Sequence, residues 1–375
     1  MDKQHLGSSE IRAKNRSDIF WLFRQSEKLC RQSVVSGLGL SLPTVTHYLQ
    51  ELQREGLILR SGSIGCAGGR RANAYCLNDR ARTAIGLDVT RNHATAAALD
   101  LRGNILTSIR RNLSFARTDA YFQELGHLVR ETVRAAQLEP EGILGVGIAV
   151  PGLLTPDKQS LFYCGVLDFS NVTLAELSRY IPYPTALCHD TDAAGFAEIW
   201  NNPDTTTAFY LMLSDSIGGS VYIDGQPFEG QNLRAGEVGH LLLVPGGKPC
   251  YCGHRGCMDA YCSAGVLTGA AGGSLERFFH LLKLEDPRIT AVWQEYLEHL
   301  ARTVGYLRML FDCDIILGGY VGSHMAPYMD SLHTLAARYD PFEDRADYLL
   351  PCRYRTEPVA AGAALGYISA FLEQV

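Results

Sequence analysis

Two neighbouring stretches decide how this chain is interpreted: Gly236-Glu237-Val238-Gly239-His240 and Cys250-Tyr251-Cys252-Gly253-His254-Arg255-Gly256-Cys257. The second stretch places three thiols within eight residues, and it begins ten residues after the histidine. Thiolate and imidazole ligands together form closed tetrahedral Zn²⁺ sites, which are usually structural. Two glycines give this short loop the backbone freedom to wrap an ion. The alternative is a run of reduced, buried cysteines, because the spacing differs from the paired C-x₂-C pattern of zinc fingers.

The composition is that of an ordinary soluble globular protein, with 375 residues, 20% charged and 46% hydrophobic. A chain of this length exceeds a single hydrophobic core, so two or three domains are expected. No stretch has the apolar length of a membrane helix, and the polar N-terminus lacks a signal-peptide apolar region. Eleven cysteines, an odd number, indicate a reducing compartment. We therefore expect a cytoplasmic protein with no membrane partner.

Charge is unevenly distributed along the chain. Residues 1–80 contain twelve Lys and Arg against seven Asp and Glu, a net charge of +5. Because the whole chain has a net charge of −6, the remainder has −11. A basic head on an acidic body predicts that the head binds a polyanion.

The head has the pattern of a winged helix-turn-helix domain. Apolar residues at helical spacing predict three helices, over residues 15–25, 31–37 and 42–55. Ser41 is a natural N-cap for the third helix, Pro43 suits its first turn, and Gly56 ends it. We expect this helix to bury one side and to expose the other. The predicted inner residues are Val45, Leu49 and Leu52, and the predicted outward residues are Thr44, Thr46, His47, Tyr48 and Gln50.

A two-stranded wing is predicted after the third helix, from the apolar runs at residues 57–60 and 75–77. In such domains short polar side chains at the start of the third helix reach base edges, while arginines hold phosphates. An arginine at the tip of the wing can enter a minor groove. The predicted DNA contacts are Arg31, Ser41, Thr44, Thr46, His47, Arg70 and Arg71. A small helical domain that binds a protein is the alternative, which the basic excess disfavours.

From residue 84 onward, strands alternate with helices in two successive groups. Strands are predicted over residues 84–89, 95–100, 105–108, 143–150, 185–188, 208–213 and 220–223, and helices over 119–136 and 174–180. This pattern predicts an α/β body of two ribonuclease-H/actin-like lobes with a cleft between them. The expected domains are a winged helix-turn-helix over 1–80 and a body over 84–375. Lobe 1 would cover about 84–192 plus the C-terminal helix, and lobe 2 about 193–355.

The chain resembles the ROK family of repressors, open reading frames and sugar kinases, in its repressor branch with an N-terminal winged helix. The resemblance covers nearly the whole chain. It is carried by Gly236–His240, the Cys-x-Cys-Gly-x-x-Gly-Cys run at 250–257, Val150-Pro151-Gly152, His189-Asp190 and Ile315-Ile316-Leu317-Gly318-Gly319. It implies a structural zinc ion held by His240, Cys250, Cys252 and Cys257. It also implies a sugar bound between the lobes by Gly152, His189, Asp190, Glu237, His240 and Asp259.

The sequence departs from the family's kinases at both phosphate loops. The kinases open with Asp-x-Gly-Gly-Thr, whereas residues 88–93 here read Asp-Val-Thr-Arg-Asn-His. The second loop, Gly-Thr-Gly-x-Gly in the kinases, reads Ser-Asp-Ser-Ile-Gly at 214–218, and Asp215 adds a negative charge where the triphosphate would lie. Phosphoryl transfer needs positioned phosphates and a metal ion. We therefore expect a degenerate ATP site.

The sugar side is better preserved. Asp190 matches the carboxylate that deprotonates the sugar hydroxyl in family kinases, and in a non-kinase it can still accept a hydrogen bond. His189 and Asp192 stand where the family has asparagines. Asp259 replaces a glutamate and is one methylene shorter, which suggests an altered sugar preference. Taken singly, each acid would be read as a solvated surface carboxylate; only the match to the motif favours a binding role.

These observations predict a sugar-responsive transcriptional repressor of carbohydrate metabolism. It would bind operator DNA as a homodimer or tetramer, with a monosaccharide or sugar phosphate as effector. An active ATP-dependent sugar kinase fused to a DNA-binding domain is the alternative. Regulation through a protein partner is a third, weaker possibility.

Overall fold

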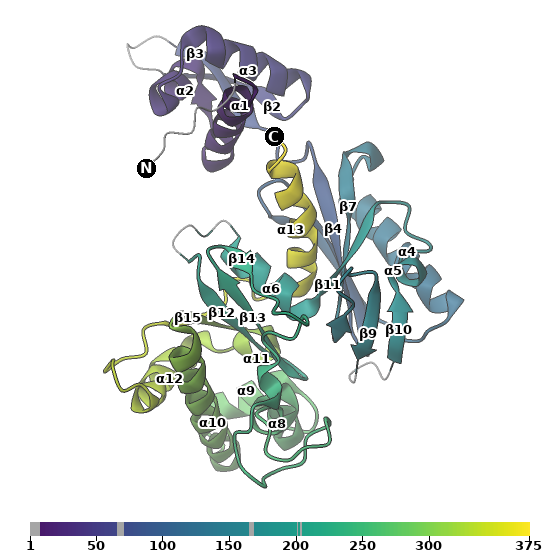
Figure 1. Ribbon diagram of the computed structural model, residues 1–375, viewed down its shortest axis with the longest axis vertical. Coiled ribbons are helices and arrows are strands. Elements are labelled where there is room, and N and C mark those ends of the chain that lie inside the picture. Colours follow the sequence, from purple (N-terminus) through teal and green to yellow (C-terminus); the bar gives the residue numbers. More distant parts are fainter. Residues whose placement is uncertain (1–7, 66–70, 165–168, 201, 203–204) are drawn as a thin grey trace.

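The computed structural model of the protein describes residues 8–65, 71–164, 169–200, 202 and 205–375. A small helical head stands at one end of the molecule, above two α/β lobes (Figure 1). Helix α13 (Pro358–Leu372), the last of the chain, runs from the junction of the lobes back toward the head. Among the described residues no helix has the length and apolar character needed to cross a bilayer.

The head contains the expected three helices and wing. Its helices are α1 (Ser8–Gln25), α2 (Arg31–Leu38) and α3 (Leu42–Arg54), and its strands are β1 (Leu29–Cys30), β2 (Ile58–Gly65) and β3 (Arg71–Leu77). β3 lies between the other two strands and is antiparallel to both. Two features were not predicted. α1 extends seven residues further toward the N-terminus than expected, and β1 adds a third strand beside the wing.

Helix α3 begins as predicted, because the Ser41 hydroxyl accepts a hydrogen bond from the Thr44 N–H at 3.3 Å. Gly56 follows the helix with φ +73°, a conformation that glycine adopts without strain. The prediction that Tyr48 faces outward was wrong, since this residue is buried. It lies three residues after Val45 and four before Leu52, on the inner face of the helix.

Lobe 1 is built on a five-stranded sheet in the order β11-β7-β4-β5-β6. The strands are β4 (Thr83–Val89), β5 (His93–Leu99), β6 (Ile105–Asn112), β7 (Ile143–Val150) and β11 (Thr185–His189). β4, β5 and β6 are antiparallel neighbours, whereas β7 and β11 run parallel to β4. The predicted strands of this lobe are therefore confirmed.

The two faces of this sheet are covered by different helices. Alternate residues of β4, including Ile85 and Leu87, belong to the core packed against α4 (Asp119–Ala135). On the opposite face α13 approaches closely, because a Cβ at Gly86 would lie only 1.7 Å from the Ala360 carbonyl oxygen. The small residues of α13 thus allow it to pack closely against the sheet.

A smaller three-stranded sheet extends lobe 1 toward the cleft. It consists of β8 (Leu153–Leu154), β9 (Ser160–Cys164) and β10 (Phe169–Thr173), followed by α5 (Leu174–Leu177). Helix α5 is shorter than predicted. A capping box between Thr173 and Glu176 starts it, and the prolines at 182 and 184 disfavour its continuation.

Lobe 2 contains the second five-stranded sheet, in the order β14-β13-β12-β15-β16. Its strands are β12 (Ala208–Leu213), β13 (Ile217–Ile223), β14 (Gln226–Pro227), β15 (Asp314–Gly318) and β16 (Leu349–Pro351). Strand β13 begins three residues earlier than predicted, because the Ile217–Gly219 segment pairs with β12. The helices beside this sheet are α7 (Asp259–Cys262), α8 (Ala264–Ala270), α9 (Leu275–Lys283), α10 (Pro287–Phe311), α11 (Gly319–Gly322) and α12 (Met329–Ala336).

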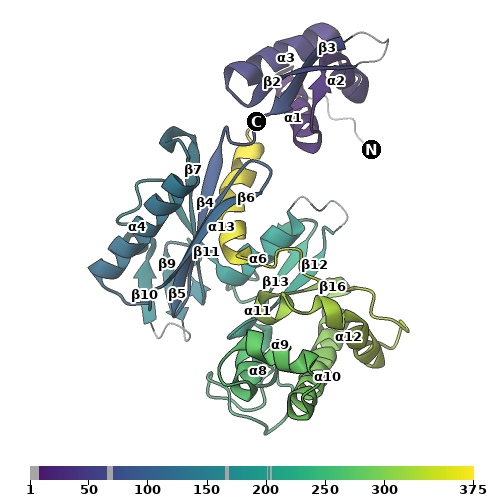
Figure 2. The same cartoon turned by 180° about the vertical axis from the view of Figure 1, so that it is seen from behind.

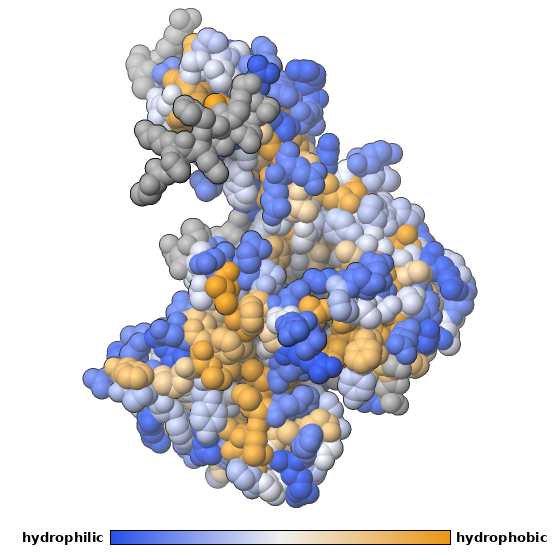
Figure 3. Space-filling view, in the orientation of Figure 1, coloured by the Kyte–Doolittle hydropathy of each residue, from blue (hydrophilic) through white to orange (hydrophobic). Residues whose placement is uncertain are grey.

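Helix α6 (Asp190–Ile199) joins the two lobes (Figure 2). A Cβ at Gly362 of α13 would lie 1.6 Å from the Ala193 carbonyl oxygen, so the two helices are in close contact. On its other side, α6 places Gly195 against Ser220 and Tyr222 of β13. The lobe boundary suggested after residue 192 therefore falls inside one continuous helix. Hydrophobic residues gather on both sides of this junction at the molecular surface (Figure 3).

Candidate functional site

The residues predicted to bind zinc come together in lobe 2. One potential ligand atom from each of His240, Cys250, Cys252 and Cys257 lies within 4.8 Å of the others. The Cys252 and Cys257 sulfurs are 3.7 Å apart, and the His240 Nδ1 atom is 3.9 Å from the Cys250 sulfur. Ligands about 2.0–2.3 Å from a tetrahedral Zn²⁺ lie roughly 3.5–3.8 Å from one another. The side chains are therefore already arranged to hold zinc.

The loop that carries these ligands is ordered by its own backbone. The Gly256 N–H donates to the Lys248 carbonyl at 2.8 Å, and Cys250 N–H donates to the His254 carbonyl at 2.8 Å. Gly253 and Gly256 have φ of +89° and +87°, which confirms the expected use of glycine. The His254 Nδ1 atom lies 3.5 Å from the Cys252 sulfur, outside the four-ligand set.

A cavity of about 330 Å³ lies between the lobes beside the zinc ligands. Five of the six predicted sugar contacts line it: Gly152, His189, Asp190, Glu237 and His240. They come from the β7–β8 turn, the β11–α6 junction and the loop before the cysteines. Residues from distant parts of the chain thus form one polar wall, of the size and character suited to a small polyhydroxylated ligand.

His189 and Asp190 form the polar centre of this wall. The Thr191 hydroxyl is 2.7 Å from His189 Nδ1, and His189 Nε2 is 3.5 Å from the Asp190 carboxylate. Burial raises the pKa of Asp190, and the neighbouring Glu237 carboxylate acts in the same direction. Burial lowers the pKa of His189, but the surrounding carboxylates outweigh this effect and raise it overall. The pair can therefore offer both a donor and an acceptor to a ligand.

Asp259 is placed differently from the expectation. It is buried and lies outside the wall of this cavity. Its carboxylate accepts a hydrogen bond from the Ile217 N–H at 2.8 Å. Because Ile217 does line the cavity, Asp259 supports the wall through the first residue of β13.

Several wall residues were not predicted from the sequence. Arg234, Tyr251 and Tyr163 line the cavity, and the Tyr251 ring meets the His240 ring edge-on with centroids 5.4 Å apart. Tyr251 lies between two zinc ligands in the sequence, and this position could have identified it. Arg234 and Tyr163 lie in segments without a recognisable motif.

The expected ATP region forms a neighbouring cavity of about 240 Å³. Four carboxyl groups line it, from Asp88, Asp190, Asp215 and Glu357, and so do the three arginines Arg91, Arg110 and Arg355. Burial raises the pKa of Asp88 well above its usual value, and Asp190 adds to the effect. The Thr90 hydroxyl is 2.9 Å from His93 Nδ1, so side chains fill the loop where family kinases have glycines. The side chains in this loop disfavour the close backbone approach that a bound triphosphate needs.

Two of the predicted DNA contacts on α3, Thr44 and His47, line one hollow at the surface of the head, and Thr46 lies outside it. Ser41 and His47 are exposed, and Thr44 and Thr46 are half-buried. Arg71 begins β3 and is exposed, whereas Arg70 lies outside the described residues. Arg31 is engaged within the head, since its guanidinium donates to the Tyr75 hydroxyl at 3.2 Å.

A buried arginine connects the head to the body. Arg24 of α1 lies between two indole rings, 4.7 Å from the centroid of Trp21 and 4.2 Å from that of Trp200. Its Nε donates to the Leu101 carbonyl at 3.1 Å. Burial, followed by the nearby Arg102, lowers the pKa of Arg24 to about 10, so it remains charged at neutral pH. Trp200 is the residue that ends α6.

Comparison with known proteins assigns the chain to a family. The family model described as "ROK family" matches residues 84–365. The chain belongs to the ROK family. It is 25% identical over 248 residues to the xylose repressor of Bacillus subtilis (strain 168), covering 65% of this chain and 64% of that protein. It is 24% identical over 277 residues to the DNA-binding transcriptional dual regulator NagC of Escherichia coli (strain K12), covering 73% and 66%.

Solved ROK structures share the fold. A ROK family transcriptional regulator, described as a homolog of the Escherichia coli MLC protein, matches with a TM-score of 0.74 and 21% identity, over 97% of both chains. A ROK glucokinase from Streptomyces griseus, in complex with glucose and AMPPNP, matches with a TM-score of 0.65 and 21% identity. That match covers 75% of this chain and 98% of the kinase. The α/β fold with a winged helical head is thus confirmed.

Proposed function

We propose that this ROK protein is a transcriptional repressor whose affinity for operator DNA depends on a sugar bound between its lobes. The observation that carries the proposal is helix α6. Its first residue, Asp190, lies in the wall of the inter-lobe cavity, and the residue that ends it, Trp200, stacks on Arg24 of the head. One rigid element therefore connects the predicted sugar site with the predicted DNA-binding domain.

The effector would be a monosaccharide or a sugar phosphate. The Asp190 and Glu237 carboxylates would accept hydrogen bonds from hydroxyl groups, and Arg234 supplies a cation at the same wall. A sugar that contacts both lobes changes their relative position, and α6 transmits that change to Trp200. Such a sugar regulates DNA binding only if it binds one lobe arrangement more tightly than the other.

Zinc would have a structural role in this mechanism. The four protein ligands would fill a tetrahedral coordination shell, which leaves no position for a reacting water. When bound, the ion would fix the loop that presents His240 and Glu237 to the cavity. His240 could contact zinc through Nδ1 and leave its other nitrogen for a sugar hydroxyl.

The second candidate is an ATP-dependent sugar kinase, because Asp190 occupies the position of the catalytic base of ROK kinases. Two features favour the repressor instead. The first phosphate loop has lost its glycines, and Thr90 and His93 fill it. The curated relatives described above are also repressors or transcriptional regulators.

The proposal is tested by selecting genomic DNA fragments that bind the purified protein and by screening sugars and sugar phosphates for a shift in melting temperature. A ligand that binds the folded state raises the melting temperature. ADP release is then measured with the sugar that gives the largest shift. Sugar-dependent DNA binding without ADP release supports the repressor. Sugar-dependent ADP release that is abolished by Asp190→Asn would establish the kinase instead.

A second test concerns helix α3 of the head. Thr44→Ala and His47→Ala should reduce binding to the selected fragment more than binding to random DNA, since these side chains lie where base edges are read. Fluorescence anisotropy with both DNAs measures the ratio. An equal loss on both would exclude this helix as the element that reads sequence.

A further inference from the structure

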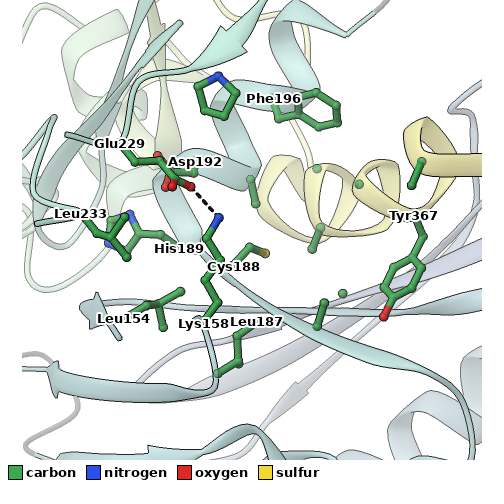
Figure 4. Close-up of a pocket in the computed structure, with 18 of the residues that line it drawn as sticks. Leu154, Lys158, Leu187, Cys188, His189, Asp192, Phe196, Glu229, Leu233 and Tyr367 are labelled. Carbon is green, nitrogen blue, oxygen red and sulfur yellow. Dashed lines mark hydrogen bonds and ion pairs between the residues drawn. The ribbon is translucent and has the colours of Figure 1, made fainter. Parts of the chain in front are cut away.

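The proposed function leaves a second cavity between the lobes unexplained, with a volume of about 510 Å³ (Figure 4). It lies between β11, α6, α13 and the segment that follows β14. Leu154, Leu187, Leu233 and Phe196 give it apolar walls. Charged groups gather at one end, and Tyr367 lies at the other (Figure 4). This volume and mixture of groups are typical of a small-molecule site.

One charge at the polar end has no partner. Lys158 pairs with Glu229, with 2.6 Å between Nζ and Oε1. The Asp192 carboxylate, in contrast, makes no hydrogen bond or ion pair with any described residue. Burial raises the pKa of Asp192 to about 6, and His189 and Lys158 only partly oppose this effect. An unpaired carboxylate facing an apolar cavity is costly, and a ligand cation would relieve that cost.

This cavity shares its wall with the sugar cavity. Gly152 and His189 line both of them. In the loop before the zinc ligands, Leu233 and Ala235 face the second cavity, whereas Arg234 and Glu237 face the sugar cavity. Neighbouring residues of one loop therefore contact two different spaces. A ligand in either cavity would affect the position of the same wall.

We infer that this cavity is a second ligand site, which binds a small organic cation with an apolar body and a primary ammonium group. The ammonium would lie against Asp192, and the apolar body would extend along Leu187 toward Tyr367. An anion is disfavoured, because Lys158, the lysine among the described residues that line the cavity, is already paired with Glu229. This inference rests on the cavity alone and holds whether the protein is a repressor or a kinase.

The inference is tested with three probes of similar shape and different charge: 2-phenylethylamine, 2-phenylethanol and 3-phenylpropanoate. Binding to the full-length protein is measured by calorimetry. The amine should bind at least about tenfold more tightly than the alcohol, since only the amine forms a charge-assisted contact. The anion should bind more weakly than the alcohol.

Two variants locate the site, and each has a matched control. Asp192→Asn removes the unpaired charge, and Asp224→Asn removes an exposed carboxylate in the β13–β14 turn. Gly366→Leu fills the cavity from α13. A Cβ at Gly366 meets no atom within 4 Å, so this variant should fold, and Gly366→Ala reproduces the change in helix propensity without filling the space.

We expect Asp192→Asn and Gly366→Leu each to weaken amine binding at least tenfold, while both controls bind like the parent protein. The inference is overturned if the amine does not bind at millimolar concentration. It is equally overturned if all three probes bind alike, or if neither Asp192→Asn nor Gly366→Leu weakens binding. Because the assay detects neither DNA nor sugar, its failure would leave the proposed function standing.

Discussion

Replacing Trp200 by leucine should separate sugar binding from DNA binding. The Trp200 ring lies 4.2 Å from the guanidinium carbon of Arg24, and Arg24 is only 6% exposed. A desolvated cation–π contact of this kind contributes about 2 kcal/mol. Its loss corresponds to a change of about thirtyfold in an equilibrium constant. We therefore expect the contact between Arg24 and the end of α6 to weaken by about that factor, while the hydrogen bonds from Arg102 to carbonyls of the head still join head and body.

The consequence for regulation follows from typical coupling energies. Allosteric coupling is usually about 1–3 kcal/mol, so losing about 2 kcal/mol at the connecting contact removes most of it. In Trp200→Leu, sugar affinity measured by calorimetry should stay within about twofold of the parent value. The effect of that sugar on operator affinity, measured by fluorescence anisotropy, should nearly disappear.

Trp21→Leu is the matched control for this experiment. Trp21 also stacks on Arg24, at 4.7 Å, but both residues belong to α1. This change removes a cation–π contact within the head and leaves the contact with the body. It should retain the sugar response. If Trp200→Leu also retains the full response, α6 does not transmit the signal and the reasoning is refuted.

Three further predictions concern the inter-lobe region. Asp190→Asn should weaken sugar binding by about tenfold to a hundredfold, because a hydrogen bond to a charged group contributes about 1.5–3 kcal/mol. The circular dichroism spectrum should not change. An unchanged sugar affinity, measured by calorimetry, would exclude Asp190 as a contact. Cys257→Ser should abolish stoichiometric zinc binding and the sugar-induced shift in melting temperature, whereas Cys76→Ser in the head should keep both. A zinc-free protein whose melting temperature still shifts normally with sugar would contradict the structural role proposed for zinc. The raised pKa of Asp192, about 6, means that the folded state holds a proton that the unfolded state releases near pH 4. The free energy of unfolding should therefore fall as pH rises from about 4 to about 6, and Asp192→Asn should remove this contribution. The melting curves of variant and parent must be compared across pH, because other charged groups face the same region: Lys158, Glu229, His189 and Asp190.

The zinc ligands could be predicted from the sequence because they lie close together along it. His240 and Cys257 are the outermost of the four, and the glycines between them indicate a tight loop. The strands of lobe 1 were predictable for a similar reason, since each has a local apolar pattern. The start of α1 was missed because residues 8–14 are mostly polar and show no apolar periodicity.

Features that depend on distant contacts could not be predicted in this way. The role of Asp259 depends on the N–H of Ile217, which lies 42 residues away. The second cavity is bounded by an ion pair between Lys158 and Glu229, 71 residues apart. No local pattern encodes such a pairing, which arises only when the two lobes come together.

In the proposed function, a sugar bound between the lobes changes the affinity of the head for DNA. The most direct test measures the dissociation constant of the selected operator fragment by anisotropy, with and without the sugar that most raises the melting temperature. We predict that the sugar changes this dissociation constant at least about fivefold, in line with ordinary allosteric coupling, and that it causes no such change in Trp200→Leu. Equal DNA affinity with saturating sugar and without it would exclude the proposed regulation.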